Sequence, residues 1–162
     1  MSTKIIKVTK KNISEAGYLF DLYRQFYKYK SNIKASTNYI KDRINKKESF
    51  IFLCLYKNQP AGFLQLYETF DSLNINKKLI LYDLYVDEKF RRNGIGRKLM
   101  NTAKKLAKSK KIKIVELSTA TNNKKAQALY ESLDYKRDKE YYRSEEHTSE
   151  LQSQFRISYA VF

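Results

Sequence analysis

Two glycines and three arginines lie within seven residues of one another in the segment 91–97, which reads Arg-Arg-Asn-Gly-Ile-Gly-Arg. Glycine lets a backbone approach a ligand closely and turn its N–H groups toward it. If a helix begins at about Ile95, its first N–H groups add a partial positive charge, and the arginines add full charges. These residue types at this spacing predict a site for a phosphate or pyrophosphate group. A plain surface loop that carries arginines is the alternative.

Two other phosphate-binding loops fit this segment less well. A P-loop requires Gly-x-x-x-x-Gly-Lys-Ser/Thr, and the chain contains no such string. A dinucleotide-binding fingerprint requires a third glycine where Leu99 stands, although Glu116 follows at the distance expected of its acidic residue. The missing glycine makes that interpretation weak.

The chain has one cysteine, Cys54, and one histidine, His147. One cysteine rules out a disulfide framework or a cysteine-clustered zinc site. His147 lies in a segment that we interpret below as foreign to the protein, and without it Ser-His-Asp, Cys-His and His-ligated metal chemistry lack their parts, so we predict no metal site. Cys54 lies inside an apolar run and is interpreted as a core residue. No apolar run approaches the ~20 residues of a membrane span, which predicts a cytoplasmic protein without a membrane partner.

The 33 Lys and Arg against 17 Asp and Glu give a formal net charge of +16. A basic domain suggests nucleic-acid binding, most directly through the lysine-rich stretch 97–111. Yet lysine outnumbers arginine 25 to 8, and Lys, Asn, Ile and Tyr share A/T-rich codons. Recognition surfaces use arginine more often, for its bidentate fork. We therefore prefer genome composition as the cause and keep a non-catalytic basic nucleic-acid-binding module as the alternative function.

The C-terminal segment matches a translated sequencing adapter. Residues 143–153 read Arg-Ser-Glu-Glu-His-Thr-Ser-Glu-Leu-Gln-Ser, as that adapter does, and residues 157–162 match the codons after its sample barcode. We therefore predict a domain over residues 1–142 and a non-native tail over residues 143–162, and we exclude the tail from inferences about fold and function.

The domain shows the hydrophobic patterns of strands and helices in alternation. Apolar runs predict strands at 5–8, 50–56, 61–67, 79–86, 112–117 and 135–139. Apolar residues at helical spacing predict helices over 16–27, 37–44, 95–107 and 124–133, and polar turns fall at 57–60 and 71–77. Hairpins in the first half and strand–helix–strand units in the second half predict an α+β domain. Its mixed central sheet has about six strands and flanking helices.

Two stretches of this domain resemble the GNAT superfamily of N-acetyltransferases. The family signature, Arg/Gln-x-x-Gly-x-Gly/Ala between a strand and a helix, is matched by residues 91–96. A second element, Asn-x-x-Ala-x-x-x-Tyr, is matched by residues 123–130. Segments 23–27 and 126–138 look most like a bacterial histone-acetyltransferase-like branch with polyamine acetyltransferases as relatives. The resemblance implies a GNAT-like fold and transfer of the acetyl group of acetyl-CoA to a primary amine, by direct attack in a ternary complex.

The resemblance also implies where acetyl-CoA binds. The glycine loop would hold its pyrophosphate, and the strand before the loop would pair with the pantetheine arm and polarise the thioester carbonyl. Asn123 would contact acetyl-CoA where strands 79–86 and 112–117 splay apart. The implied cofactor-binding residues are Leu84, Tyr85, Val86, Arg91, Arg92, Asn93, Gly94, Ile95, Gly96, Arg97 and Asn123.

Tyr130 and Asp83 are the candidate catalytic residues. By resemblance, Tyr130 would protonate the departing thiolate, since a thiol of pKa ~8.5 leaves more easily with a phenol of pKa ~10 in reach. Without the motif, Tyr130 would be interpreted as an aromatic residue of the core. An alkylammonium of pKa ~10.4 must lose a proton before it attacks. Asp83 is the preferred base, because a charge within so apolar a strand is costly unless it faces a polar cleft. Glu68 and Glu116 are the alternative candidates for the base, and a purely structural role is the alternative for Asp83.

The motifs leave the acceptor open among a polyamine, another small amine, and a lysine or N-terminus of a protein. Nearby carboxylates favour a cationic small molecule or basic peptide, and a homodimer is left open. The chain departs from the family at Asp134, where glycine is usual at a left-handed helix end that Asp tolerates. The family's final strand would begin near residues 140–142, so we predict that the native last strand is missing. Residues 157–162 would pair there only by accident.

Overall fold

The computed structural model describes residues 2–139 and 156–161. Its helices are α1 (Ile13–Phe26), α2 (Ile33–Asn45), α3 (Ile95–Ser109) and α4 (Lys124–Glu131). Its strands are β1 (Thr3–Lys7), β2 (Phe50–Tyr56), β3 (Gln59–Asp71), β4 (Asn76–Val86), β5 (Ile114–Ala120), β6 (Lys136–Arg137) and β7 (Arg156–Val161). Two 3₁₀ turns, η1 (Lys10–Asn12) and η2 (Glu88–Phe90), precede α1 and follow β4.

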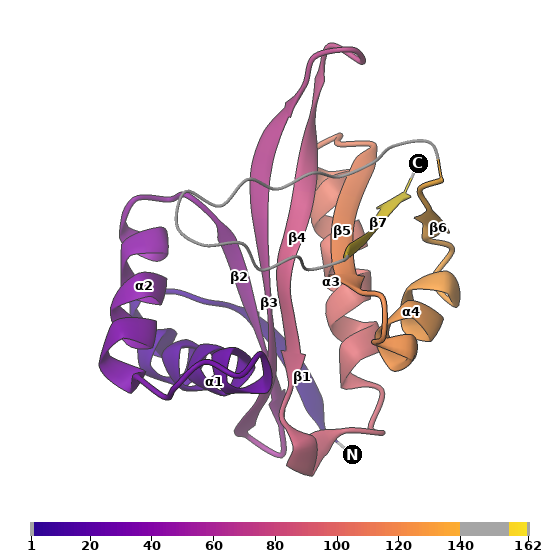
Figure 1. The fold of residues 1–162 in the computed structure, drawn as a ribbon. Coiled ribbons are helices and arrows are strands. Elements are labelled where there is room, and N and C mark those ends of the chain that lie inside the picture. The colour runs from indigo at the N-terminus through magenta and orange to yellow at the C-terminus, as the bar shows by residue number, and fades with distance from the viewer. Residues whose placement is uncertain (1, 140–155, 162) are drawn as a thin grey trace, which may run out of the picture.

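The strands form one mixed sheet in the order β1-β2-β3-β4-β5-β7-β6. β1 to β4 are antiparallel neighbours, β5 runs parallel to β4, and β7 is antiparallel to β5 and β6. Parallel strands need a long connection, and α3 provides it between β4 and β5. Figure 1 shows α1 and α2 beside the first strands and α3 on the other side of the sheet. The predicted α+β class and mixed sheet are confirmed.

Apolar residues on both faces of the central strands explain why helices cover both sides. Successive residues of a strand point to opposite faces. Ile51 and Leu53 of β2 pack with α1 and α2, whereas Cys54, the next residue, packs with α3. All three side chains are fully buried, as predicted for Cys54. A continuous apolar run therefore marks a strand in the middle of a three-layer domain.

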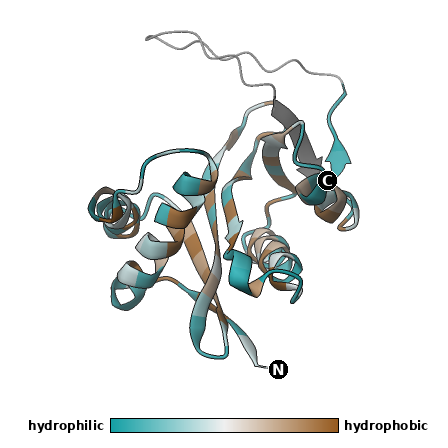
Figure 2. Cartoon of the chain, turned by 60° about the horizontal axis from the view of Figure 1, so that its bottom comes forward, coloured by the Kyte–Doolittle hydropathy of each residue, from teal (hydrophilic) through white to brown (hydrophobic). Residues whose placement is uncertain are grey.

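α3 buries a single stripe of its surface against the sheet. The stripe recurs at helical spacing through Ile95, Leu99, Met100, Ala103 and Ala107. Figure 2 shows the hydrophobic sides of the helices turned toward the strands and the hydrophilic sides turned outward. Within the described part of the chain, no helix combines the length and apolarity that crossing a membrane requires.

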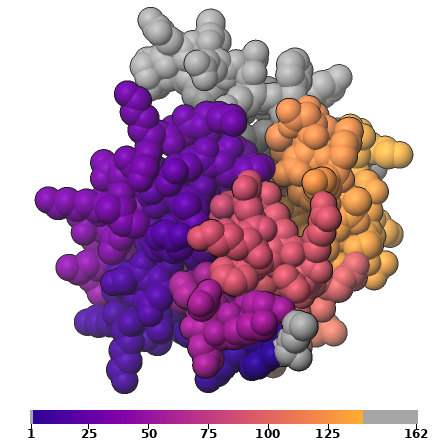
Figure 3. Space-filling model, turned by 90° about the horizontal axis from the view of Figure 1, so that it is seen from below, coloured from indigo at the N-terminus to yellow at the C-terminus, as the bar shows by residue number. Residues whose placement is uncertain are grey.

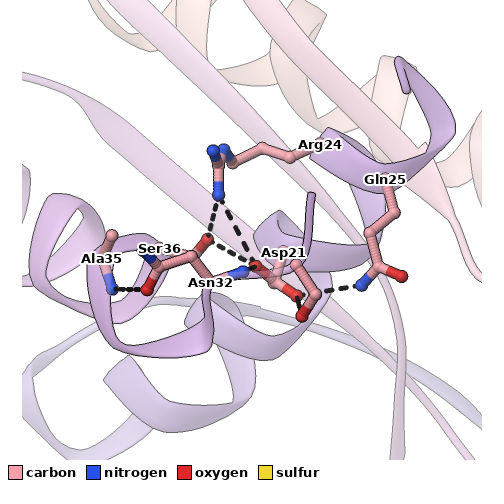
Figure 4. A network of polar contacts seen from close by, with 7 residues as sticks. Asp21, Arg24, Gln25, Asn32, Ala35 and Ser36 are labelled. Atoms are coloured by element: carbon pink, nitrogen blue, oxygen red, sulfur yellow. Dashed lines mark hydrogen bonds and ion pairs between the residues drawn. The ribbon is translucent and has the colours of Figure 1, made fainter. Parts of the chain in front are cut away.

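A buried carboxylate joins α1 to α2. Asp21 is 3% exposed and accepts hydrogen bonds from the hydroxyls of Ser31 (2.7 Å) and Ser36 (2.8 Å), the N–H of Asn32 (2.8 Å) and the amide of Gln25 (2.9 Å) (Figure 4). Burial alone would raise the pKa of Asp21, but the hydrogen bonds outweigh burial and lower it. The network fixes the connection between the two helices.

The hairpin between β3 and β4 is longer than predicted. The sequence predicts a turn over residues 71–77, but β3 continues to Asp71 and β4 begins at Asn76. Backbone pairing continues through Phe70↔Lys77 and Asp71↔Asn76. Backbone hydrogen bonds hold this ribbon together, so the polarity of its side chains does not end the strands.

Most of the predicted non-native tail lies outside the described residues. β7, near its end, pairs with β5 from Val115↔Val161 to Ala120↔Arg156 and lies between β5 and β6. The strand beside β5 is thus formed by residues 156–161, nearly the stretch that the sequence analysis expects to pair there only by accident. The non-native origin of residues 143–162 and the loss of a native last strand stay predictions.

Candidate active site

β4 and β5 separate in the middle of the sheet. Their parallel pairing ends at Leu81↔Leu117, although β4 continues to Val86. On its other side, β4 pairs with β3 through Gln65↔Asp83 and Leu66↔Leu81, so Tyr82 is an extra residue in a β-bulge. A bulge bends its strand and breaks the ladder locally. Beyond the bulge, the edge of β4 toward β5 has no strand partner among the described residues.

The free edge of β4 presents peptide groups at Leu84 and Val86. The N–H of Asp87 donates to the carbonyl of Ala61 on β3. Because peptide groups alternate between the two sides of an antiparallel strand, those of Tyr85 also face β3, and those of Leu84 and Val86 face outward. The outward carbonyl of Val86 accepts a hydrogen bond from Arg91 at 3.0 Å.

Hydrogen bonds of Asn93 fix the conformation of the loop between β4 and α3. The Asn93 amide donates to the carbonyls of Phe90 (3.0 Å) and Arg91 (3.2 Å), and its oxygen accepts from the Tyr56 hydroxyl (3.3 Å). Arg92, with φ 65°, is left-handed. Figure 3 shows this connection in the middle of the lower face, with the N-terminal helices on one side and α4 on the other.

The N-terminus of α3 fits an anionic group. Gly94 caps it with φ 71°, no side chain caps the first N–H groups, and a Cβ built on Gly94 meets nothing within 4 Å. Ile95 is buried and anchors the first turn, and a Cβ on Gly96 would lie 3.2 Å from Leu129 of α4. Unpaired N–H groups, a helix dipole and open space above a glycine are what a pyrophosphate needs.

The three arginines differ in how firmly they are held. Arg91 donates to Val86, lies 3.3 Å from Glu88, and has its guanidinium 5.8 Å from the centroids of both the Phe26 and Tyr85 rings. Arg97 donates to the Ser132 hydroxyl of the α4 C-cap at 2.8 Å. Arg92 is exposed. All three flank the N-terminus of α3.

The second sequence motif forms α4. The Asn123 oxygen accepts from the N–H of Ala126 at 3.2 Å and so caps the helix. Gln127 donates to the carbonyls of Ala120 (3.1 Å) and Thr121 (2.9 Å), which ties α4 to the end of β5. Tyr130, one turn on, is 6% exposed. The motif thus places Tyr130 on a helix whose start is fixed to the strand beside the β4–β5 gap.

Asp83 follows the bulge of β4. Its carboxylate accepts from the Gln65 amide at 2.6 Å and is hydrogen-bonded to Tyr23 of α1. Burial raises the pKa of Asp83, and the two hydrogen bonds offset that rise only in part. The residue as a whole, backbone included, is half-buried.

Tyr23 of α1 meets β4 at the bulge. Its hydroxyl faces the carbonyl of Tyr82 (3.3 Å) and the carboxylate of Asp83, either of which can accept its hydrogen. Burial first, and then the charge of Asp83, raise the pKa of Tyr23, and Tyr130 is among the other groups near enough to contribute. The hydroxyl of Tyr23 is therefore a direct neighbour of the candidate base.

The other carboxylates considered are held in ion pairs. Glu68 lies 2.5 Å from Lys77 and 3.0 Å from Lys110, and these hydrogen bonds lower its pKa. Glu116 lies 2.7 Å from Lys78. Among the described residues, no three His, Cys, Asp or Glu side chains gather as a metal site would require.

The model of the Acetyltransferase (GNAT) family matches residues 17–135. The chain belongs to this family. It is 36% identical over 120 residues to the uncharacterized N-acetyltransferase YhfO of Bacillus subtilis (strain 168), covering 74% of this chain and 80% of that protein. It is 28% identical over 132 residues to the thialysine N-epsilon-acetyltransferase of Caenorhabditis elegans, covering 82% of each.

A crystal structure of a probable acetyltransferase has the same fold, with a TM-score of 0.85 and 32% sequence identity over 91% of this chain and 99% of that chain. The GNAT chain described here is therefore an acyltransferase that depends on acetyl-CoA.

Sequence reasoning missed Tyr23 and Gln65 of this GNAT site. They precede Asp83 by 60 and 18 residues in the sequence, and no motif joins them to it. Gln65 did carry a signal, because it is the one polar residue in the otherwise apolar run 61–66 and is fully buried. A buried amide needs partners, and here they are Asp83 and the hydroxyl of Ser49 at 2.8 Å.

Proposed function

We propose that this GNAT enzyme transfers the acetyl group of acetyl-CoA to a primary alkylamine by direct attack in a ternary complex. The acceptor is a polyamine, another small amine, or a lysine or N-terminus of a protein. The observation that carries the proposal is the end of β4. There, Asp83 comes directly before the outward peptide groups of Leu84 and Val86. One short segment thus serves both the donor and the acceptor.

Acetyl-CoA, when bound, supplies an acetyl group that is activated as a thioester. We propose that the N–H groups around Gly94 and the charges of Arg91, Arg92 and Arg97 hold its pyrophosphate. The free edge of β4 pairs with the amides of the pantetheine arm as an added strand would. An outward N–H of that edge stabilises the negative charge that develops on the carbonyl oxygen. Asn93 and Ile95 keep the loop and helix in place.

Asp83 is proposed as the base and Tyr130 as the acid. An alkylammonium of pKa ~10.4 must lose its proton to become a nucleophile, and a carboxylate whose pKa is raised by burial accepts a proton more readily. Tyr130 lies on the α4 side of the same region and donates to the departing thiolate. Asn123 sets the start of the helix that carries Tyr130.

A relative named for N-epsilon acetylation of thialysine supports a terminal alkylamine as acceptor. The family match favours an enzyme over the nucleic-acid-binding module, since a basic surface alone requires neither motif.

The test is release of free thiol from acetyl-CoA with spermidine, thialysine, lysine and a peptide N-terminus as acceptors. We expect saturable, amine-dependent release, with intersecting initial-rate lines that indicate a ternary complex. Tyr130→Phe should lower kcat by about 10²-fold. Tyr135→Phe is the matched control, because this buried tyrosine has its ring centroid 6.2 Å from that of Tyr130 and its hydroxyl has no hydrogen-bond partner among the described residues. Thiol release that no amine accelerates would contradict the proposal.

A further inference from the structure

The hairpin of β3 and β4 extends beyond the rest of the sheet. β2 pairs with β3 only as far as Leu66, and β5 pairs with β4 only from Lys78 onward. Among the described residues, the two strands of segment 70–77 therefore pair only with each other. Figure 1 shows this segment projecting past the ends of the other strands, at the top of the molecule. We call residues 70–77 the β3–β4 ribbon.

The ribbon carries three large apolar side chains that the fold does not bury. Phe70 is 75% exposed, Leu73 is 93% exposed and Ile75 is 94% exposed. Single exposed apolar residues are ordinary on a protein surface, but these three lie within six residues at one projecting tip. A local gathering of this kind is typical of a surface that binds a protein or a membrane.

The backbone of Ile75 is strained. Its φ of 49° is left-handed, which a β-branched residue adopts only at a cost. Polar contacts fix the turn around it: the Asp71 carboxylate accepts from the side-chain amide of Asn74 at 2.8 Å, and the N–H of Ile75 donates to the carbonyl of Ser72 at 3.2 Å. Asn or Gly would fit this position without strain. Because the exposed side chain gains no packing in return, the fold alone does not explain an isoleucine here.

Lysines surround the base of the ribbon. Glu68 of β3 lies 2.5 Å from Lys77 and 3.0 Å from Lys110, which places the C-terminal end of α3 beside the ribbon. The chain from that end into β5, residues 108–115, carries four lysines and no acidic residue. The pairing of Lys78 with Ile114 brings this connection to the same place.

Aromatic rings are interleaved with these lysines. The ammonium groups of Lys7 and Lys110 lie 5.6 Å and 4.8 Å from the centroid of the Phe50 ring. Lys77 lies 5.8 Å from the centroid of the Phe70 ring. The apolar tip therefore continues into a surface where positive charges lie against rings.

We propose that the β3–β4 ribbon docks the protein on an anionic lipid membrane. Phe70, Leu73 and Ile75 enter the boundary between headgroups and acyl chains, and the lysines at the base of the ribbon contact the lipid phosphates. The lack of a spanning segment predicts no membrane partner, but attachment at the interface requires no such segment.

The charge and the shape of the tip favour lipid over other partners. A second copy of the chain would bring two lysine-rich ends together, which repel each other. A nucleic acid stacks its bases on π faces, which Leu73 and Ile75 lack. A projecting tip needs a concave counterpart on a protein, whereas a bilayer deforms around it.

The docked orientation leaves the candidate active site free. β4 has 11 residues and rises about 3.3 Å per residue, so its two ends lie about 30 Å apart. The tip is at one end, and Val86 and the loop to α3 are at the other.

The first test uses the absence of tryptophan from the chain. Leu73→Trp places a single fluorophore at the tip. With vesicles of phosphatidylcholine and one-third phosphatidylglycerol, we expect its emission to shift to the blue and to be quenched by lipids brominated on their acyl chains. Vesicles of phosphatidylcholine alone should give neither effect. Tyr29→Trp is the matched control, since Tyr29 is 62% exposed at the end of α1 and should stay in water. No shift and no quenching for Leu73→Trp, or equal quenching of Tyr29→Trp, overturns the inference.

The second test removes the apolar tip and keeps every charge. The double variant Leu73→Ser, Ile75→Asn should sediment with the anionic vesicles at least tenfold more weakly than the unaltered chain. Tyr29→Ser should bind as the unaltered chain does. Equal binding by the double variant would mean that the net charge of +16 alone attracts the vesicles, and it overturns the inference. Both positions are exposed and Asn suits the φ of residue 75, so the melting temperature should not fall.

This inference goes beyond the proposed function and does not rest on it. The double variant should release thiol from acetyl-CoA with a soluble amine at the rate of the unaltered chain. Vesicle binding without acetyl transfer would refute only the reaction. Acetyl transfer without vesicle binding would refute only the docking.

Discussion

At the scale of single residues, Asp83 combines burial with the lack of an ion-pair partner among the described residues. Its carboxylate accepts hydrogen bonds from Gln65 and Tyr23 and has a raised pKa, because burial outweighs both bonds. A structural carboxylate has partners that favour its charged form and so lower its pKa, as hydrogen bonds do for Asp21 and two lysines do for Glu68. The raised pKa of Asp83 is therefore more typical of a functional carboxylate than of one that stabilises the fold.

Asp83→Asn should stabilise the fold while it impairs the reaction. Folding raises the pKa of Asp83, so its carboxyl binds a proton more tightly in the folded than in the unfolded state. The free energy of unfolding therefore falls as the pH rises above the unfolded pKa of about 3.9. The variant should melt at a higher temperature than the unaltered chain at pH 7, with the difference vanishing toward pH 4. Its kcat should fall about 10²-fold or more. Circular-dichroism melts between pH 4 and 8 and initial rates measure the two effects.

Glu116→Gln is the control for that pair of measurements. Glu116 is half-buried on the neighbouring strand and pairs with Lys78, so its loss should leave kcat within about twofold. If Asp83→Asn melted lower than the unaltered chain at pH 7, or kept its full rate, the role given to Asp83 would be wrong.

At the scale of elements, the side of the proposed active site that carries Tyr23 depends on how α1 meets α2. The Asp21 network ties the two helices that carry Phe20, Tyr23 and Tyr39 (Figure 4). Because the network fixes how the two helices meet, it also bears on where these three rings lie.

Asp21→Ala should lower the free energy of unfolding by about 2–3 kcal/mol, because it leaves buried donors without an acceptor. For a domain of this size that corresponds to a melting temperature about 4–12 °C lower. The pKa of Asp21 is lowered in the folded state, so its contribution is complete above the unfolded pKa and is lost as the pH falls through the folded one. The two proteins should therefore differ at pH 7 and converge in acid. Asp42→Ala, at an exposed position of α2, should change little, and an equal loss there would count against the network.

The elements show what the sequence could and could not predict. Continuous apolar runs predicted β2 within its observed bounds, and the stripe through Leu99 and Met100 predicted α3, because burial leaves a periodic record in the sequence. The bulge at Tyr82 could not be predicted in this way, because it arises from the register in which β4 pairs with β3 and not from the hydrophobic pattern of β4 itself. The partners of Asp83 were hidden for the same reason: only the register and the packing of α1 bring Gln65 and Tyr23 to it.

At the scale of the whole molecule, the net charge of +16 complicates any test of the donor site. Every polyanion is attracted to such a surface, and acetyl-CoA is itself an anion. The proposed acetyl-CoA site differs from this general electrostatic attraction, because it uses fixed backbone groups at Gly94 and along the free edge of β4. Hydrogen bonds to such groups are screened by salt much less than contacts among exposed side chains.

Acetyl-CoA should therefore raise the melting temperature of the full chain in a way that survives salt. A ligand at 100 times its Kd adds about 2.7 kcal/mol, which is about 5–10 °C for a domain of this size. Tripolyphosphate, a polyanion without the pantetheine arm, should give a smaller rise that disappears between 50 and 500 mM salt. Gly94→Ala should weaken the acetyl-CoA effect, because it adds a Cβ at φ 71° to the space above α3. Two results together would contradict this prediction: salt abolishes the rise in melting temperature with acetyl-CoA, and Gly94→Ala leaves that rise unchanged. The general positive charge, and not the β4–α3 junction, would then be binding acetyl-CoA.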